Sequence, residues 1–154
     1  MKKLVLSVAV IAAVLATQSC KKKKADAATT AVAPTATISG TVYAETDFTN
    51  AKIEKATGAT VYLLVDTKDL ALNPSTTTSY ATKVYKTTVD GSGKYTFTNF
   101  PVGPKAMNVT VKLGDWETTR TLSATSTDVH VFIGAQAIII NAFENGAFIQ
   151  DFTY

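Results

Sequence analysis

The feature that most constrains the fold is an alternation of apolar and polar residues that begins at Thr37 and recurs to the end of the 154-residue chain. Successive side chains of a β-strand point to opposite faces, so a period of two is typical of strands with one buried face. The pattern predicts an all-β domain, an antiparallel β-sandwich of about seven to nine strands. The expected strands share this alternation and lie at 37–43, 59–66, 79–89, 94–98, 106–113, 116–122, 128–133, 137–144 and 147–153.

Two short turns are expected to close hairpins. Asp90-Gly91-Ser92-Gly93 separates the strand 79–89 from 94–98, and Asn145-Gly146 separates 137–144 from 147–153. Asp, Ser and Gly are frequent turn formers, and Asn-Gly tolerates positive φ at both positions of a two-residue turn. We therefore predict that each of these two turns joins strands that pair with each other.

Three other segments are expected to interrupt the strands. The polar composition of 44–58 predicts an exposed loop. The segment 67–78 is the least regular, and it is expected to hold one short helical turn at 68–72 before Asn73-Pro74 ends it. Two prolines and a glycine in 99–104 are expected to stop the strand before them.

The strand 59–66 is expected to be central, because both of its faces are fairly apolar. One face carries Val61, Leu63 and Val65, and the other carries Thr60, Tyr62 and Leu64. Tyr95 and Phe97 alternate on one side of 94–98 and are expected to fill the core.

Three motifs, Ile38-Ser39-Gly40-Thr41-Val42-Tyr43, Gly58-Ala59-Thr60-Val61-Tyr62-Leu63 and the segment 88–103, occur in a recognisable order. This order resembles the carboxypeptidase regulatory-like domains, which share the prealbumin-like seven-stranded sandwich. The resemblance covers residues 37–113 well. The chain departs from it at Gly103-Pro104-Lys105-Ala106 and in the additional strands expected around Asn145-Gly146. The resemblance implies a fold and a use as a structural module, an adhesin or pilus stalk repeat or a receptor appendage, but no reaction.

The first residues have the pattern of an export signal. Lys2 and Lys3 precede an apolar run from Leu4 to Ala16, which is shorter than the roughly twenty residues that a membrane-spanning helix needs. A small residue, Ser19, precedes Cys20, and this resembles the lipobox of bacterial lipoproteins, although Thr17 stands where a large aliphatic residue is usual. We therefore expect a signal peptide at 1–19, a lipidated Cys20 with a flexible tether at 20–35, and the β-sandwich at 36–154.

The charge distribution bears on partners and location. Residues 25–154 carry nine basic and twelve acidic residues, a net charge of −3, so the folded part lacks the clustered cations that nucleic acid binding needs. Lys21, Lys22, Lys23 and Lys24 follow the lipid site, where each is expected to add about 1 kcal/mol of attraction to anionic headgroups. Surface-exported lipoproteins of Bacteroidota-like bacteria tend to carry acidic residues at this place. We therefore expect anchoring in the outer membrane, with the periplasmic face favoured over the cell surface.

Few residues are available for catalysis or metal binding. Cys20 is the only cysteine, so the domain has no disulfide and no thiol nucleophile, and His130 and Arg120 are the only residues of their kinds. One histidine does not make a zinc site, and His130 is expected to be a solvent-facing strand residue. The transthyretin-like hydrolase of ureide metabolism requires several histidines and is excluded. We predict no enzyme activity, no cofactor and no metal.

Recognition is the remaining class of function. Tyr80, Tyr85, Phe100 and Trp116 are candidates for an exposed aromatic surface that binds a glycan or a protein, with packing in the core as the alternative. Trp116 is the best candidate because it lies at an expected turn. The sequence favours a membrane-anchored envelope protein that acts as a non-enzymatic binding or structural module, with an envelope protein as partner, and the alternative is a carbohydrate-binding module.

Overall fold

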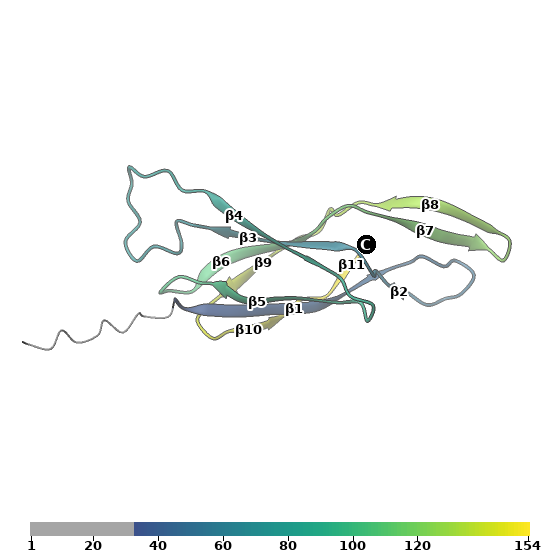
Figure 1. Ribbon diagram of the computed structural model, residues 1–154, viewed down its shortest axis with the longest axis horizontal. Helices are drawn as coiled ribbons and strands as arrows, with labels where there is room; N and C mark the ends of the chain where they lie inside the picture. Colours follow the sequence, from purple (N-terminus) through teal and green to yellow (C-terminus); the bar gives the residue numbers. More distant parts are fainter. Residues whose placement is uncertain (1–32) are drawn as a thin grey trace, which may run out of the picture. The chain divides into compact units, whose positions relative to one another are not determined.

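Two β-sheets pack face to face, and a two-stranded ribbon extends from one end of them (Figure 1). The computed structural model describes residues 33–154, so the predicted signal peptide, Cys20 and Lys21 to Lys24 lie outside the described residues. Every regular element in this part is a strand, and the predicted all-β sandwich is confirmed. None of its elements is a helix of the length and apolarity needed to span a bilayer.

The described residues form eleven strands, two more than the upper end of the expected range, because two of them are only two residues long. In chain order the strands are β1 (Thr35–Ala44), β2 (Glu54–Lys55), β3 (Thr60–Asp66), β4 (Thr82–Thr88), β5 (Lys94–Pro101), β6 (Met107–Leu113), β7 (Trp116–Ser123), β8 (Ser126–Phe132), β9 (Ala137–Ala142), β10 (Ala147–Ile149) and β11 (Phe152–Thr153).

The first sheet is built around β1. On one edge β1 pairs with β5 and then β2, both antiparallel, and on the other edge it pairs with β10 and β11, both parallel. Every second residue of β1 is buried, as the alternation predicts. The two parallel pairings were not expected, because they join segments more than one hundred residues apart that no local turn connects.

The second sheet has the strand order β4-β3-β6-β9, and all of its pairs are antiparallel. The prediction that the strand 59–66 is central is confirmed, since β3 lies between β4 and β6. Val61, Leu63 and Val65 point inward and are fully buried, whereas Tyr62 and Leu64 lie on the outer face and are half-buried.

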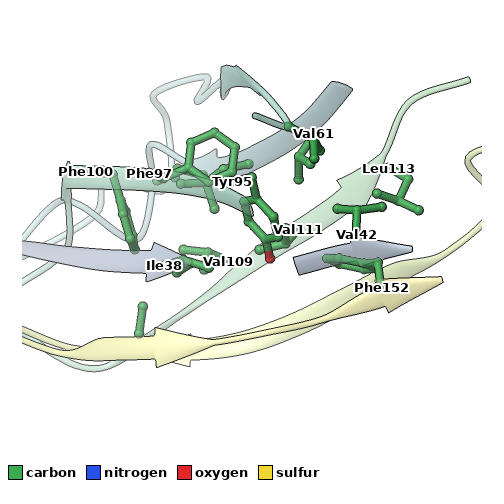
Figure 2. Close-up of a cluster of buried hydrophobic side chains, with 14 of the residues drawn as sticks. Ile38, Val42, Val61, Tyr95, Phe97, Phe100, Val109, Val111, Leu113 and Phe152 are labelled. Atoms are coloured by element: carbon green, nitrogen blue, oxygen red, sulfur yellow. The ribbon is translucent and has the colours of Figure 1, made fainter. Parts of the chain in front are cut away.

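The core lies between these two sheets, and Figure 2 shows its largest side chains. β5 contributes Tyr95, Phe97 and Phe100, which confirms the prediction for the first two. The Tyr95 hydroxyl donates to the Gln150 carbonyl oxygen at 2.7 Å, so this core ring also holds the break between β10 and β11. No polar or charged residue is buried among residues 33–154. The packing of the sandwich is therefore almost wholly apolar.

Both predicted turns are present, but neither closes a hairpin. The Asp90 carboxylate accepts hydrogen bonds from the backbone N–H groups of Ser92 and Lys94 at 2.8 and 2.9 Å, and Gly93 has a φ of 81°. After this turn the chain leaves β3, the partner of β4, and pairs with β1 as β5. The Asn145-Gly146 turn likewise carries the chain from the second sheet to the first. In this second turn only Asn145 has a positive φ. The predicted hairpin pairings are wrong, because β5 and β10 both pair with β1 instead of with the strands that precede them.

The segment 99–104 does not stop β5 where expected. Asn99 adopts a φ of 53° and belongs to a β-bulge. At this bulge, the two residues of β5 between Phe97 and Phe100 face one residue of β1, the residue between Ala36 and Ile38. The extra residue returns Phe100 to the inner face, and β5 continues to Pro101.

Three smaller expectations also need correction. Residues 67–70 form successive turns rather than a helical turn. β4 begins at Thr82 instead of residue 79. The polar loop 44–58 contains β2, and its Asp47 forms a parallel bridge with Thr121 of the ribbon.

Candidate binding surfaces

The four aromatic residues singled out from the sequence do not form one surface. Phe100 is only 2% exposed and belongs to the core, so it is not available for binding. Tyr85 is half-buried and packs against the core from β4. Tyr80 lies just before β4, near the end of β3, whereas Trp116 lies close to Gly58, before the start of β3. The seven residues of β3, about 20 Å, separate them.

Trp116 instead belongs to an aromatic cluster at the base of the ribbon. Its ring centroid lies 5.5 Å from that of Phe132 and 5.7 Å from that of Tyr154. His130 packs edge-on against Phe132 at 4.7 Å and is half-buried, so it is less solvent-facing than expected. This cluster joins the ribbon to the sandwich, and Trp116 is half-buried within it.

Tyr154 connects the aromatic cluster to the outer face of the second sheet. Its hydroxyl donates to the Gly114 carbonyl oxygen at 2.6 Å. Burial, followed by the charge of Asp115 and the neighbouring Tyr62, raises the pKa of Tyr154 to about 12. The hydroxyl is therefore a neutral donor throughout the physiological range.

A shallow depression of about 510 Å³ lies on this outer face, next to Gly114. Its lining combines an aromatic ring, aliphatic side chains, one cation and one carboxylate. The lining residues are Tyr62, Leu64, Val84, Lys112, Leu113, Gly114, Asp115 and Gly134. The Lys112 Nζ atom lies 5.8 Å from the centroid of the Tyr62 ring. The depression thus offers a stacking surface beside groups that can form charged hydrogen bonds.

Two glycines shape the rim of this depression. A Cβ atom at Gly114 would lie 2.7 Å from the Tyr62 ring, and one at Gly134 would lie 2.5 Å from the Leu113 carbonyl oxygen. The Asp115 carboxylate accepts a hydrogen bond from the Gly134 N–H at 2.9 Å, which joins the two sides of the rim. Sequence reasoning placed Tyr62 on the second face of a central strand but did not single it out. The sequence feature that could have pointed to Tyr62 was the apolar character of that second face.

A second depression, of about 340 Å³, lies at the opposite end of β3. It is formed by the loop after β3 and the segment that leads into β6, and Lys68, Asp69 and Lys105 line it. Leu72, also in its lining, is an exposed loop residue. Its walls are mostly turns, so this depression offers less regular contacts than the one around Tyr62.

Several carboxylates already form hydrogen bonds or an ion pair with neighbouring residues. Hydrogen bonds from the Thr49 side chain and backbone lower the pKa of Asp47, and those from the Ser92 hydroxyl and the Lys94 N–H lower the pKa of Asp90. Arg120 pairs with Asp128 across the ribbon at 2.8 Å. Within residues 33–154, no three His, Cys, Asp or Glu side chains converge in a way that would hold a metal ion.

Large apolar side chains are exposed on the ribbon and along one side of the sandwich. On the ribbon, Val129, Val131 and Ile133 alternate on the outer face of β8 and the residue after it. On the sandwich, Ile139 of β9 is 68% exposed and Ile149 of β10 is 81% exposed. Exposed apolar surface of this kind marks sites of interaction when its members are contiguous.

Comparison with known proteins shows little similarity. No protein-family model matches the chain, and no significant match is found among curated proteins. A crystal structure from Pseudomonas aeruginosa, described as a "putative carbohydrate binding protein", is similar with a TM-score of 0.47 and 17% sequence identity. The match covers 79% of this chain and 90% of that chain. Similarity at this level assigns no function, and the class defined here is that of an all-β sandwich protein with an appended ribbon.

Proposed function

We propose that this chain is a lipid-anchored cell-envelope protein whose β-sandwich acts as a non-enzymatic binding module. Cys20 carries the lipid, Lys21 to Lys24 contact anionic headgroups, and the following residues tether the sandwich to the periplasmic face of the outer membrane. The observation that carries the binding role is the exposure of large apolar side chains on the ribbon and along one side of the sandwich.

The arrangement of the sandwich fits a tethered module. The described chain begins at Ala33, at the end of the sandwich that also carries the loop between β3 and β4 (Figure 1). The ribbon of β7 and β8 extends from the opposite end. Attachment through the residues before Ala33 therefore leaves the ribbon and the nearby Tyr62 depression free to meet a partner.

The anchor is tested by metabolic labelling with a fatty-acid probe in the native bacterium or a close relative. We expect the wild-type chain to take up label and to fractionate with membranes, and Cys20→Ser to lose both properties. Replacing Lys21 to Lys24 with glutamine should keep the label and weaken binding to anionic vesicles. Unlabelled wild-type chain would rule out the anchor.

Protease treatment of intact cells tests the side of the membrane. A periplasmic sandwich is protected until the outer membrane is permeabilised. Release of the sandwich from intact cells would instead place it on the cell surface.

A second candidate function is carbohydrate binding at the Tyr62 depression. The specific observation in its favour is the half-buried Tyr62 ring, which lines the depression beside Lys112 and Asp115. Aromatic rings stack on the apolar faces of sugars, and charged groups can bind sugar hydroxyls. This location replaces the surface around Trp116 expected from the sequence. A single lining carboxylate fits binding, whereas most glycoside hydrolases use two.

A glycan array followed by calorimetry tests this candidate. We expect Tyr62→Ala to weaken binding of any glycan hit about tenfold, because one aromatic stacking contact contributes on the order of 1 kcal/mol. Tyr80→Ala is the matched control, since Tyr80 lies in a loop and does not line the depression. A hit that depends on Tyr80 and not on Tyr62 would exclude this site.

A further inference from the structure

The last strand of the second sheet, β9, has an unusual composition for an edge. Its six residues are Ala-Ile-Ile-Ile-Asn-Ala, with no charge and no proline. Natural sheets protect their edges with charged residues, prolines or bulges, because unpaired backbone groups bind other strands. β9 has none of these protections, and the side chain of Ile139, at its centre, is largely exposed.

The register shows which backbone groups of β9 face outward. The Leu113 N–H donates to the Gln136 carbonyl oxygen, so the residues paired with Leu113, Val111 and Val109 are the ones bonded to β6. The alternate residues of β9 turn their N–H and C=O groups to the free edge. These residues are Ala137, Ile139 and Asn141. No backbone or side-chain hydrogen bond to these outward groups is found within residues 33–154.

We propose that β9 pairs with β9 of a second copy of this chain, antiparallel and centred on Ile139. The two four-stranded sheets then join into one continuous sheet through a two-fold interface. Ile139 faces Ile139 of the other copy, Ala137 faces Asn141, and Ile138 faces Ile140 on the inner side. Each of the three outward pairs exchanges two backbone hydrogen bonds.

The charges of the two edge strands permit pairing with a second copy at β9 and disfavour it at β4. Self-pairing of β9 places only apolar or neutral side chains opposite one another, and cross-strand pairs of this kind are favourable. Pairing two copies of β4 would instead gather four cations along the contact, Lys83 and Lys86 of each copy. Charged residues on an edge strand discourage the addition of another strand.

Apolar residues beyond β9 extend the contact area. Phe143 follows β9 directly, is 51% exposed and packs edge-on against Phe148 of β10 at 5.2 Å. Ile149 continues the apolar surface along β10. β9 alone is only about 20 Å long, so we expect these residues to contribute, and we expect the dimer to depend on protein concentration. The proposal does not depend on the lipid anchor or on a glycan.

Cysteine cross-linking in envelope membranes that contain the full chain tests both the edge and the register. The described part of the chain has no cysteine, so an introduced thiol is unique there. Paired residues centred on Ile139 have Cα atoms about 5.5 Å apart, within disulfide range. We expect Ile139→Cys to form a cross-linked dimer under mild oxidation. Ala137→Cys and Asn141→Cys should each fail alone and cross-link when mixed.

The reason for this pattern is geometric. Two copies of residue 137 would lie about 14 Å apart along the strands, too far for a disulfide. Val84→Cys is the matched control, because Val84 is 57% exposed on the outer face of the other edge strand, β4. Equal cross-linking of Val84→Cys, or of Ala137→Cys alone, would overturn the proposal.

Sedimentation of the full chain in detergent gives a second measurement. We expect a monomer–dimer equilibrium for the wild type, and at least tenfold weaker association for Ile139→Lys, with Val84→Lys unchanged. Circular dichroism verifies that both variants fold, which is expected because both side chains are exposed. A wild-type chain that stays monomeric, or that binds a different protein through β9, would refute pairing with a second copy.

Discussion

The two edge strands of the second sheet, β4 and β9, differ in how they meet solvent. β4 carries Lys83 and Lys86 among threonines, and the Lys83 Nζ atom lies 5.0 Å from the centroid of the Tyr85 ring. β9 carries no charge and exposes isoleucine. Charge on an edge strand discourages added strands. The sandwich therefore has one protected side and one side suited to contact, although both belong to the same sheet.

The strands that follow β9 in the chain, β10 and β11, belong to the first sheet. β10 and β11 are held on β1 around Gly40, where a Cβ atom would collide with the Gln150 carbonyl oxygen and lie 2.9 Å from the Tyr95 ring. The same carbonyl oxygen accepts the hydrogen bond from the Tyr95 hydroxyl. Changes at this place should therefore weaken the attachment of β10 and β11 to β1 and lower the stability of the sandwich.

The largest effect is expected from Gly40→Ala. The added methyl group has no space, so we expect a loss of about 2–3 kcal/mol in the free energy of unfolding, as for other overpacked sites. Urea unfolding followed by the fluorescence of the single tryptophan, Trp116, measures it. Gly91→Ala is the control, because nothing lies within 4 Å of a Cβ atom there. Equal losses for the two variants would contradict the close approach at Gly40.

A smaller loss is expected from Tyr95→Phe. The variant keeps the core ring but leaves the Gln150 carbonyl oxygen without its donor, which should cost about 1 kcal/mol. Chemical denaturation measures the change. Tyr80→Phe removes a hydroxyl that accepts from the Ser75 N–H in an exposed loop, and it should change stability much less. If both variants behave alike, the hydroxyl of Tyr95 does not help to hold β10 and β11.

Alkaline pH is expected to destabilise the fold through Tyr154. Its pKa of about 12 in the folded chain exceeds the ordinary value of 10.0, so the stabilisation is complete below pH 10 and is lost as the pH rises to 12. Unfolding measured at intervals over this range should show the decline. Tyr154→Phe should make the decline shallower. Burial, followed by the charge of Asp151, also raises the pKa of Tyr95, so the double variant with Tyr95→Phe should be flatter still.

The smallest effect on stability is expected when β4 is made to resemble β9. Replacing Lys83 and Lys86 with threonine should change the free energy of unfolding by about 0.5 kcal/mol or less, because both side chains are exposed. Self-association at low salt should increase, as measured by sedimentation. The same replacement at Lys52 and Lys105, both in loops, is the charge-matched control. Unchanged association would mean that lysines are not what protects β4.

The sequence predicted strands better than it predicted their partners. Alternation located most strands, since each one buries a single face, and Asp90 and Asn145 marked true reversals of the chain. Turn chemistry, however, fixes only the local reversal. Whether the next strand pairs with the previous one depends on which sheet buries its apolar face, and that is decided by β1, far away in the sequence.

The candidate surfaces were predictable only in part. The export pattern and Cys20 come from the sequence and stay predictions. Phe100 was offered as a surface candidate with core packing as the alternative, and the bulge at Asn99 turns it inward. Tyr62 and Ile139 lie in strands that were predicted, yet their exposure follows from the position of each strand in the sheet. Alternation alone does not show which face is covered.

The position of β1 has a consequence for the time at which the domain can fold. β1 is the first of the described strands in the chain, yet its neighbours include residues 147–153. The Thr41 N–H donates to the Asp151 carboxylate across 110 residues at 2.7 Å. Pairing between distant segments slows folding, because the intervening chain must be closed first. The sandwich thus stays incomplete until residues 147–153 have been made and can reach β1.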